Sequence, residues 1–147
     1  MNLVTKADAL LLKEFIDTHR FFFIAGHKEP DGDCIASSLG IAAVLDKMGK
    51  EYQLLSAGPF KRPELNEFEL QFSSSMTFLD ETERKSTGLI IVDCSELQRL
   101  GEIDGDLKNL DTFVIDHHKT SGLTDNMQGY INPEAPACAY LVQQFYE

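Results

Sequence analysis

The chain has 147 residues, and its 24 Asp and Glu outnumber its 13 Lys and Arg, which gives a formal charge of −11 at pH 7. A surface of that sign repels a phosphate backbone and so disfavours binding to long duplex DNA. Hydrophobic residues make up 43% of the sequence, enough for the core of one globular domain, while apolar runs such as residues 21–25 are far too short to span a membrane. Three widely spaced cysteines and the lack of a signal-peptide pattern predict a cytoplasmic protein with reduced thiols.

The N-terminal part of the sequence predicts two helices and two strands in alternation. Thr5 is a suitable cap for a first helix with apolar residues at helical spacing. The continuous apolar run over residues 21–27 predicts a buried strand, and the composition of residues 28–33 is typical of a turn. A second helix follows and ends at Gly49, and residues 51–58 predict the next strand.

Strands and short helices continue to alternate through the rest of the chain. The predicted elements are a short helix within 59–72, strands over 76–80 and 88–93, a short helix over 102–110, strands over 111–118 and 129–134, and a helix over 135–147. This alternation predicts an α/β fold with a mainly parallel sheet and helices on both faces.

Metal-binding residue types follow three of the predicted strands at their carboxyl ends. In chain order they are His27 with Asp31 and Asp33, then Asp93, then Asp116, His117 and His118. The carboxyl ends of parallel strands meet at one crevice, so we expect these side chains to lie together. Carboxylate and imidazole suit Mn²⁺, Mg²⁺, Fe²⁺ or Co²⁺, and clustered aspartates need cations to offset their repulsion. Two such ions roughly 3.5–4 Å apart can activate a water and hold a phosphoryl oxygen.

The stretches around these residues also resemble known motifs. FIAGHKEPDGDCIASSLGIAAVLDKMGK, IIVDCSELQRLG and VIDHHKT occur in that order, and INPEAPACAYLVQQFYE follows them. They are similar to motif I, motif II, the DHH motif and the proline-containing start of a helix in the DHH phosphoesterases. The resemblance covers residues 21–147. Within that family, PDGDCIASSLG looks more like the nanoRNase and pAp-phosphatase branch than the family II pyrophosphatases.

The resemblance implies a centre of two Mn²⁺ ions, with Mg²⁺ or Co²⁺ as alternatives. It assigns His27, Asp31 and Asp93 to the first ion. It assigns Asp33, Asp93 and His117 to the second, so that Asp93 bridges the two. The implied reaction is hydrolysis of short oligonucleotides or nucleotide phosphates of the pAp or cyclic dinucleotide type.

Further residues are expected to act on the substrate. The resemblance places His118 against the substrate phosphate and gives Asp116 the task of orienting its neighbours, so that both join Asp93 as catalytic candidates. Ser37 lies near the start of the second predicted helix, where free backbone amides favour anions. The planar guanidinium of Arg99 could bind a phosphate, although a surface or salt-bridged arginine is an equal alternative.

The sequence departs from the family pattern toward its C-terminal end. The family takes one more aspartate for the second metal from a later motif, and a glycine-rich substrate-binding domain follows. Neither lies within the 147 residues, so we expect a single DHH-type catalytic domain over 1–147, truncated at its C-terminal end. Two alternatives stay open. One is a metal- or nucleotide-binding module without catalysis, and the other is a structural module completed by a partner chain, for instance as a homodimer.

Several other residues have simpler interpretations. His19 is expected at the exposed end of a helix, and Asp125 in an ordinary loop. Cys34, Cys94 and Cys138 are expected to be small buried residues rather than thiolate ligands or a redox pair.

Overall fold

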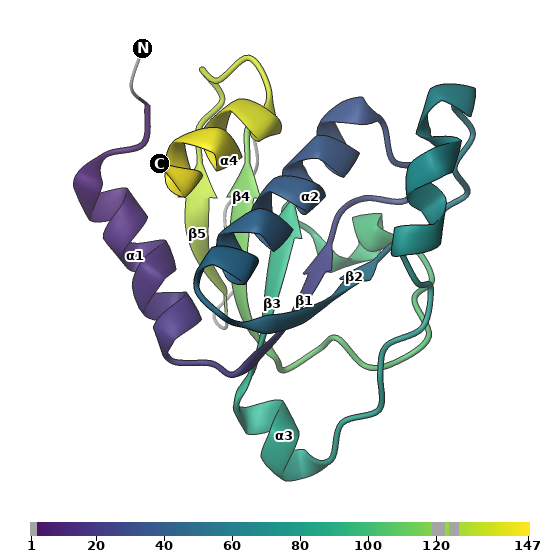
Figure 1. The fold of residues 1–147 in the computed structure, drawn as a ribbon, viewed down its shortest axis with the longest axis horizontal. Helices are drawn as coiled ribbons and strands as arrows, with labels where there is room; N and C mark the ends of the chain where they lie inside the picture. Colours follow the sequence, from purple (N-terminus) through teal and green to yellow (C-terminus); the bar gives the residue numbers. More distant parts are fainter. Residues whose placement is uncertain (1–2, 119–122, 124–126) are drawn as a thin grey trace.

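The computed structural model describes residues 3–118, 123 and 127–147, and its centre is a five-stranded sheet in which every strand pair is parallel (Figure 1). The strands are β1 (Phe21–Ala25), β2 (Glu51–Leu55), β3 (Thr87–Val92), β4 (Asp111–Asp116) and β5 (Met127–Ile131). Their order across the sheet is β2-β1-β3-β4-β5. The predicted α/β class and parallel sheet are confirmed.

The strand order sets the position of the crevice. Phe21, the first residue of β1, lies opposite Glu51 of β2 and Thr87 of β3, so the three strands begin level. The chain leaves β1 toward β2 on one side, and later strands are added on the side of β3. In open parallel sheets the ligand crevice lies where the strand order reverses, at the carboxyl ends of the two strands concerned. Here these strands are β1 and β3.

Three helices cover one face of the sheet: α1 (Lys6–Asp17), α2 (Gly32–Lys47) and α4 (Cys138–Tyr146) (Figure 1). Their buried side chains pack with Phe22, Ile90 and Phe113 of the strands. Thr5 caps α1, as predicted, through a bond from the Asp8 amide to its hydroxyl. No helix among the described residues is long and apolar enough to cross a membrane.

The opposite face is covered by short elements. They include the 3₁₀ helix η2 (Leu97–Leu100), whose Leu100 packs on Phe23 and Leu89 of the sheet together with Leu110 from an irregular segment. Two other short elements complete the element order of the described residues, the 3₁₀ helix η1 (Pro63–Gln71) and the short helix α3 (Glu81–Lys85). The long helices therefore lie on one face only, where the sequence predicted helices on both.

Two predicted elements are not formed, and both fall on residues that the structure describes. Residues 76–80 form no strand; they lead to Asp80, which caps α3, and Phe78 among them is 86% exposed. Residues 102–110 form no helix, because Gly105 and Asn109 have φ angles of 131° and 67°, which a right-handed helix does not contain.

Candidate metal centre

The residues predicted at the strand ends come together at the carboxyl edge of β1, β3 and β4. His27 follows β1 closely, Asp93 follows β3 directly, and His117 and His118 follow β4 directly. The two aspartates of the intervening turn are held by α2. Asp31 is the cap of α2 and accepts a 2.9 Å bond from the Cys34 amide, and Asp33 lies in the first turn.

Asp93 lies at the middle of this group. It is only 2% exposed, and its backbone adopts φ 63°, a left-handed conformation uncommon outside glycine. Its amide donates a 2.9 Å bond to the Ile115 carbonyl of β4, which fixes the turn to the neighbouring strand. Its two carboxylate oxygens face different histidines: Oδ2 is 3.3 Å from His27 Nε2, and Oδ1 is 3.2 Å from His117 Nε2.

His27 is oriented for ligation by its own backbone neighbourhood. Nδ1 donates a 2.8 Å bond to the Lys28 carbonyl, which leaves Nε2 directed to Asp93 and, at 3.8 Å, to Asp31 Oδ1. Metal-binding histidines commonly donate their other ring nitrogen to a carbonyl in this way. Without a cation, the hydrogen bond with Asp93 raises the pKa of His27 even though burial lowers it. Burial raises the pKa of Asp93, opposed by the hydrogen bond with His27 and assisted by the charges of Asp33 and Asp31.

His117 lies between two carboxylates on the other side of Asp93. Its Nε2 is 3.3 Å from Asp33 Oδ2 and 3.2 Å from Asp93 Oδ1. Asp93 Oδ1 is buried and accepts no hydrogen bond from the part of the chain that the structure describes. A buried carboxylate oxygen without a donor is poorly solvated, and a cation would satisfy it. The carboxylate and imidazole donors therefore fit divalent ions of the Mn²⁺ type.

Cys34 lies closer to this group than the sequence suggested. Its sulfur and the donor atoms of His27 and Asp93 all lie within 4.8 Å of one another, as do donor atoms of Asp93, His117 and His118. Burial strongly raises the pKa of the Cys34 thiol, which disfavours the thiolate form. All three cysteines are buried and free, which confirms their interpretation as small buried residues. Cys34 lies in the first turn of α2, directly after Asp33, and this position in the sequence was the available signal that it lies near His27.

Asp116 organises the end of β4. It is 1% exposed, and its Oδ1 accepts bonds from the His117 amide at 2.8 Å, the His118 amide at 3.2 Å and His118 Nδ1 at 2.7 Å. Because Nδ1 of His118 is used in this way, Nε2 is the ring nitrogen left for another partner. The His118 side chain is 49% exposed, and its ring is tilted by 45° to that of His117 with the ring centroids 4.3 Å apart.

The two candidates for substrate contact lie in different surroundings. Arg99 is exposed on η2, and its carbonyl accepts a 2.9 Å bond from the Lys28 amide, so η2 lies beside the His27 loop. No carboxylate among the described residues lies within 4.0 Å of its guanidinium. Ser37 is fully buried in α2. Substrate contact by either residue stays a prediction.

One sequence interpretation is wrong, and another lies outside the structure. His19 is 6% exposed rather than on the surface: Nδ1 bonds to the Phe15 carbonyl at 2.7 Å and Nε2 to Asp111 Oδ2 at 2.9 Å. Its carboxylate partner is 92 residues away in the sequence, so local patterning could not reveal it. Asp125 lies outside the described residues.

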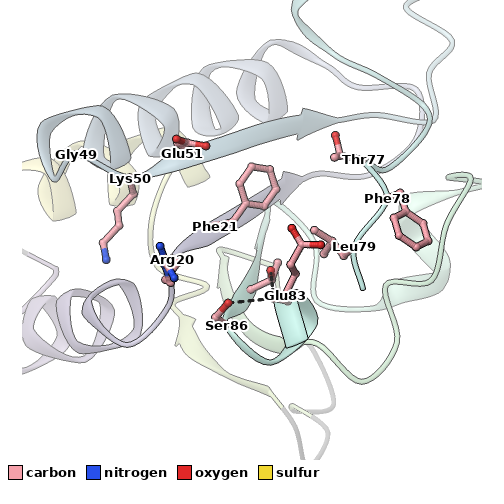
Figure 2. Close-up of a pocket in the computed structure, with 11 residues that line it drawn as sticks. Arg20, Phe21, Gly49, Lys50, Glu51, Thr77, Phe78, Leu79, Glu83 and Ser86 are labelled. Carbon is pink, nitrogen blue, oxygen red and sulfur yellow. Dashed lines mark hydrogen bonds between the residues drawn. The ribbon is translucent and has the colours of Figure 1, made fainter. Parts of the chain in front are cut away.

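A sizeable cavity lies away from this centre. Its volume is about 640 Å³, and its lining includes Phe21, Glu51 and Thr87, the first residues of β1, β2 and β3. Figure 2 shows Arg20 and Lys50 beside this cavity, together with Phe21 and Glu83. None of the strand-end aspartates or histidines lines it. The candidate centre therefore lies at the carboxyl edge of the sheet, whereas this cavity lies at the amino edge.

Comparison with known proteins gives a consistent set of matches. A sequence model described as the DHH family, N-terminal domain, matches residues 21–147. A probable manganese-dependent inorganic pyrophosphatase of Bacillus pumilus is 28% identical over 128 residues, and one of Oceanobacillus iheyensis is 30% identical over 129 residues. Each match covers 84% of this chain but only 40% of the relative, so the chain spans about two fifths of their length. A solved exopolyphosphatase-related protein from Bacteroides fragilis has the same fold, with TM-score 0.76 and 20% identity over 99% of this chain and 44% of that chain.

Proposed function

This chain belongs to the DHH family, and on that premise we propose that it carries the metal centre of a manganese-dependent phosphohydrolase. The observation that carries the proposal is the position of Asp93, whose two oxygens face two separate histidine–aspartate pairs. The names of the curated relatives, which are described as manganese-dependent, support the choice of metal. Mg²⁺ and Co²⁺ are the alternatives that the same donors accept.

The proposed ligand sets follow the two sides of Asp93. His27, Asp31 and Asp93 would hold one ion, and Asp33, Asp93 and His117 the other. The three carboxylates carry a charge of −3, which two divalent ions offset with +4. The ligand set with its ions would therefore carry about +1, and the neighbouring Asp116 carboxylate brings the group close to neutral, so that the ions rather than a net positive charge would attract a phosphate.

Bound ions would supply Lewis acidity, lowering the pKa of a water toward about 7 and stabilising charge on the phosphoryl group. The residues of the chain provide the geometry for that chemistry. Asp116 holds the His118 ring by Nδ1, so that Nε2, when the ring carries both protons, can donate a hydrogen bond to a phosphoryl oxygen at the metal centre. The exposed guanidinium of Arg99 can bind a second phosphate oxygen from the neighbouring helix η2.

For the substrate, we propose short oligonucleotides or nucleotide phosphates of the pAp or cyclic dinucleotide type. The net charge of −11 favours a short anion over a long nucleic acid, because the overall charge repels an extended phosphate backbone while the metal centre would attract a single phosphate group. Inorganic pyrophosphate is the second candidate, since the curated relatives are named as pyrophosphatases. The nanoRNase branch stays a prediction. So does a cytoplasmic location, which the three buried free cysteines support.

The first test is to remove metal from the purified chain and titrate Mn²⁺ by calorimetry. We expect two equivalents of Mn²⁺ to bind, one for each histidine–aspartate pair. The loaded chain is then offered a dinucleotide, pAp, a cyclic dinucleotide and pyrophosphate, and product is measured with and without Mn²⁺. Mn²⁺-dependent product from one substrate supports the proposal and identifies the class.

The alternatives predict other results. Two bound equivalents without product from any of the four compounds would favour a binding module without catalysis. Failure to bind Mn²⁺ at all would contradict the metal centre. The homodimer stays a prediction, which sedimentation equilibrium at several protein concentrations can test.

A further inference from the structure

The carboxylate of Asp33 has a second set of partners that the proposed ligand role does not use. Its Oδ2 accepts a 3.0 Å bond from the Cys138 amide, and its Oδ1 accepts a 2.8 Å bond from the Ala139 amide. These amides are the first two of α4, more than a hundred residues further along the chain. Asp33 Oδ2 is at the same time 3.3 Å from His117 Nε2.

Helix α4 has no cap of its own. Ala137 is its N-cap residue, and no side-chain cap bond is formed there. The first amides of a helix have no acceptor within the helix, and a carboxylate near them also benefits from the positive end of the helix dipole. Asp33 therefore serves as the cap of α4 from a different helix.

The amino end of α4 is also attached closely to the elements around the metal centre. The Cys138 thiol donates a 3.2 Å bond to the Ile115 carbonyl, the same carbonyl that accepts the amide of Asp93. On the other side, α4 lies so near α2 that a Cβ added at Gly40 would be 2.6 Å from Val142 Cγ1. A shift of α4 would therefore move the two amides that donate to Asp33 relative to the end of β4.

The two amides leave Asp33 able to bind a cation. A carboxylate offers about four lone-pair positions, and each oxygen of Asp33 uses one for an amide. Carboxylates that ligate metals are typically hydrogen-bonded to further groups that orient them, and losing such a group weakens metal binding.

We propose that the amino end of α4 positions Asp33 for metal binding, so that metal occupancy beside His117 and the docking of α4 stabilise each other. The Cys138 and Ala139 amides are then positioning groups of the centre. Coupling of this kind is reciprocal: a change that loosens the docking of α4 weakens metal binding, and metal binding in turn orders α4. The inference rests on the proposed function only in taking Asp33 as a metal ligand.

The test combines a substitution with an exchange measurement on the unmodified chain. Ala139→Pro removes the amide that bonds to Asp33 Oδ1 but breaks no bond within α4, because proline is tolerated in the first turn. Ala139→Gly is the matched control, since it keeps the amide while lowering helix propensity. Thermal unfolding without metal confirms that both variants fold.

We expect Ala139→Pro to bind the second equivalent of Mn²⁺ about tenfold more weakly than Ala139→Gly, from the loss of one hydrogen bond to a charged group. In the unmodified chain, Mn²⁺ should slow hydrogen exchange of the amides over residues 138–146. Equal Mn²⁺ affinities for the two variants would overturn the inference. If the proline variant fails to fold, the exchange measurement decides.

The outcomes also separate this inference from the proposed function. If Mn²⁺ binds and exchange over 138–146 stays unchanged, the coupling is wrong while the metal centre stands. If Mn²⁺ slows exchange in α4 but no substrate is hydrolysed, the coupling stands while the hydrolase proposal fails.

Discussion

Two histidine–carboxylate pairs lie at opposite edges of the same sheet, and only one belongs to the candidate metal centre. At the amino edge, both ring nitrogens of His19 bond to acceptors, the Phe15 carbonyl at 2.7 Å and Asp111 at 2.9 Å. At the carboxyl edge, His27 Nε2 meets Asp93 at a longer 3.3 Å, and a second carboxylate, Asp31, lies at 3.8 Å.

The difference lies in how many carboxylates converge. Among the described residues, the Asp111 carboxylate bonds to His19 alone, and its side chain is 67% exposed, so water solvates it. Asp93 is 2% exposed, faces two histidines and has a buried oxygen to which no described residue donates. A single histidine–carboxylate contact therefore joins two elements of the fold, whereas several carboxylates around two half-buried histidines create a place whose charge a bound cation would neutralise.

The strongest test of this comparison is Asp93→Asn against Asp111→Asn. Asparagine tolerates the left-handed φ of Asp93, so the fold should survive, but the bridging charge is lost. We expect Mn²⁺-dependent hydrolysis to fall by more than about 100-fold, the upper range for groups that only support a ligand. Asp111→Asn should leave the rate near that of the unmodified chain. Similar rates for the two variants would refute a special role for the carboxyl edge.

The next largest effect concerns stabilisation by metal. At an Mn²⁺ concentration about 100 times Kd, a single site raises the free energy of unfolding by about 2.7 kcal/mol. We expect His27→Ala to lose most of the gain from the site that His27 lines, and His19→Ala to keep it, because His27, unlike His19, faces the clustered carboxylates. Thermal melts with and without Mn²⁺ measure the gain. An undiminished gain in His27→Ala would remove that histidine from the ligand set.

The contrast between the two edges also shows which parts of the fold and of the candidate site could be predicted from the sequence. His27, Asp93 and His117 follow apolar runs that form β1, β3 and β4, and strand ends of this kind can be recognised locally. The burial of His19 depends on Asp111, 92 residues away, which no local pattern contains.

Two further features could not be predicted for physical reasons. The MTFLD stretch resembles a strand in composition, but it leads into the Asp80 cap of α3, and its Phe78 is exposed. The bonds from α4 to Asp33 depend on the close approach of α2 and α4 at Gly40, which is a tertiary property.

A smaller effect is expected on stability without metal. His19→Ala removes a buried ring that contacts Phe15 and Phe22, together with its bond to Asp111. We expect the free energy of unfolding to fall by about 2 kcal/mol, from the loss of hydrogen bonds and packing. Urea denaturation of the metal-free chain measures it. Lys13→Ala, which breaks an exposed ion pair within α1, the helix that ends just before His19, is the control and should change stability far less. A small effect of His19→Ala would show that the pair does not hold α1 to the sheet.

The smallest expected effect comes from arginines at the two edges. Arg99 is exposed beside the His27 loop, and Arg20 is exposed at the amino-edge cavity, so each can attract an anion, but of the two we expect only Arg99 to contact a phosphate at the proposed metal centre. We expect Arg99→Gln to raise KM about fivefold with little change in kcat, as for one exposed charge pair. Arg20→Gln removes the same charge at a distance and should leave KM unchanged at ordinary ionic strength, because salt screens charges beyond about 10 Å. Direct contact between Arg99 and the substrate should make the increase in KM larger for Arg99→Gln than for Arg20→Gln. Equal increases for the two variants would mean that Arg99 acts only through the net charge of the protein.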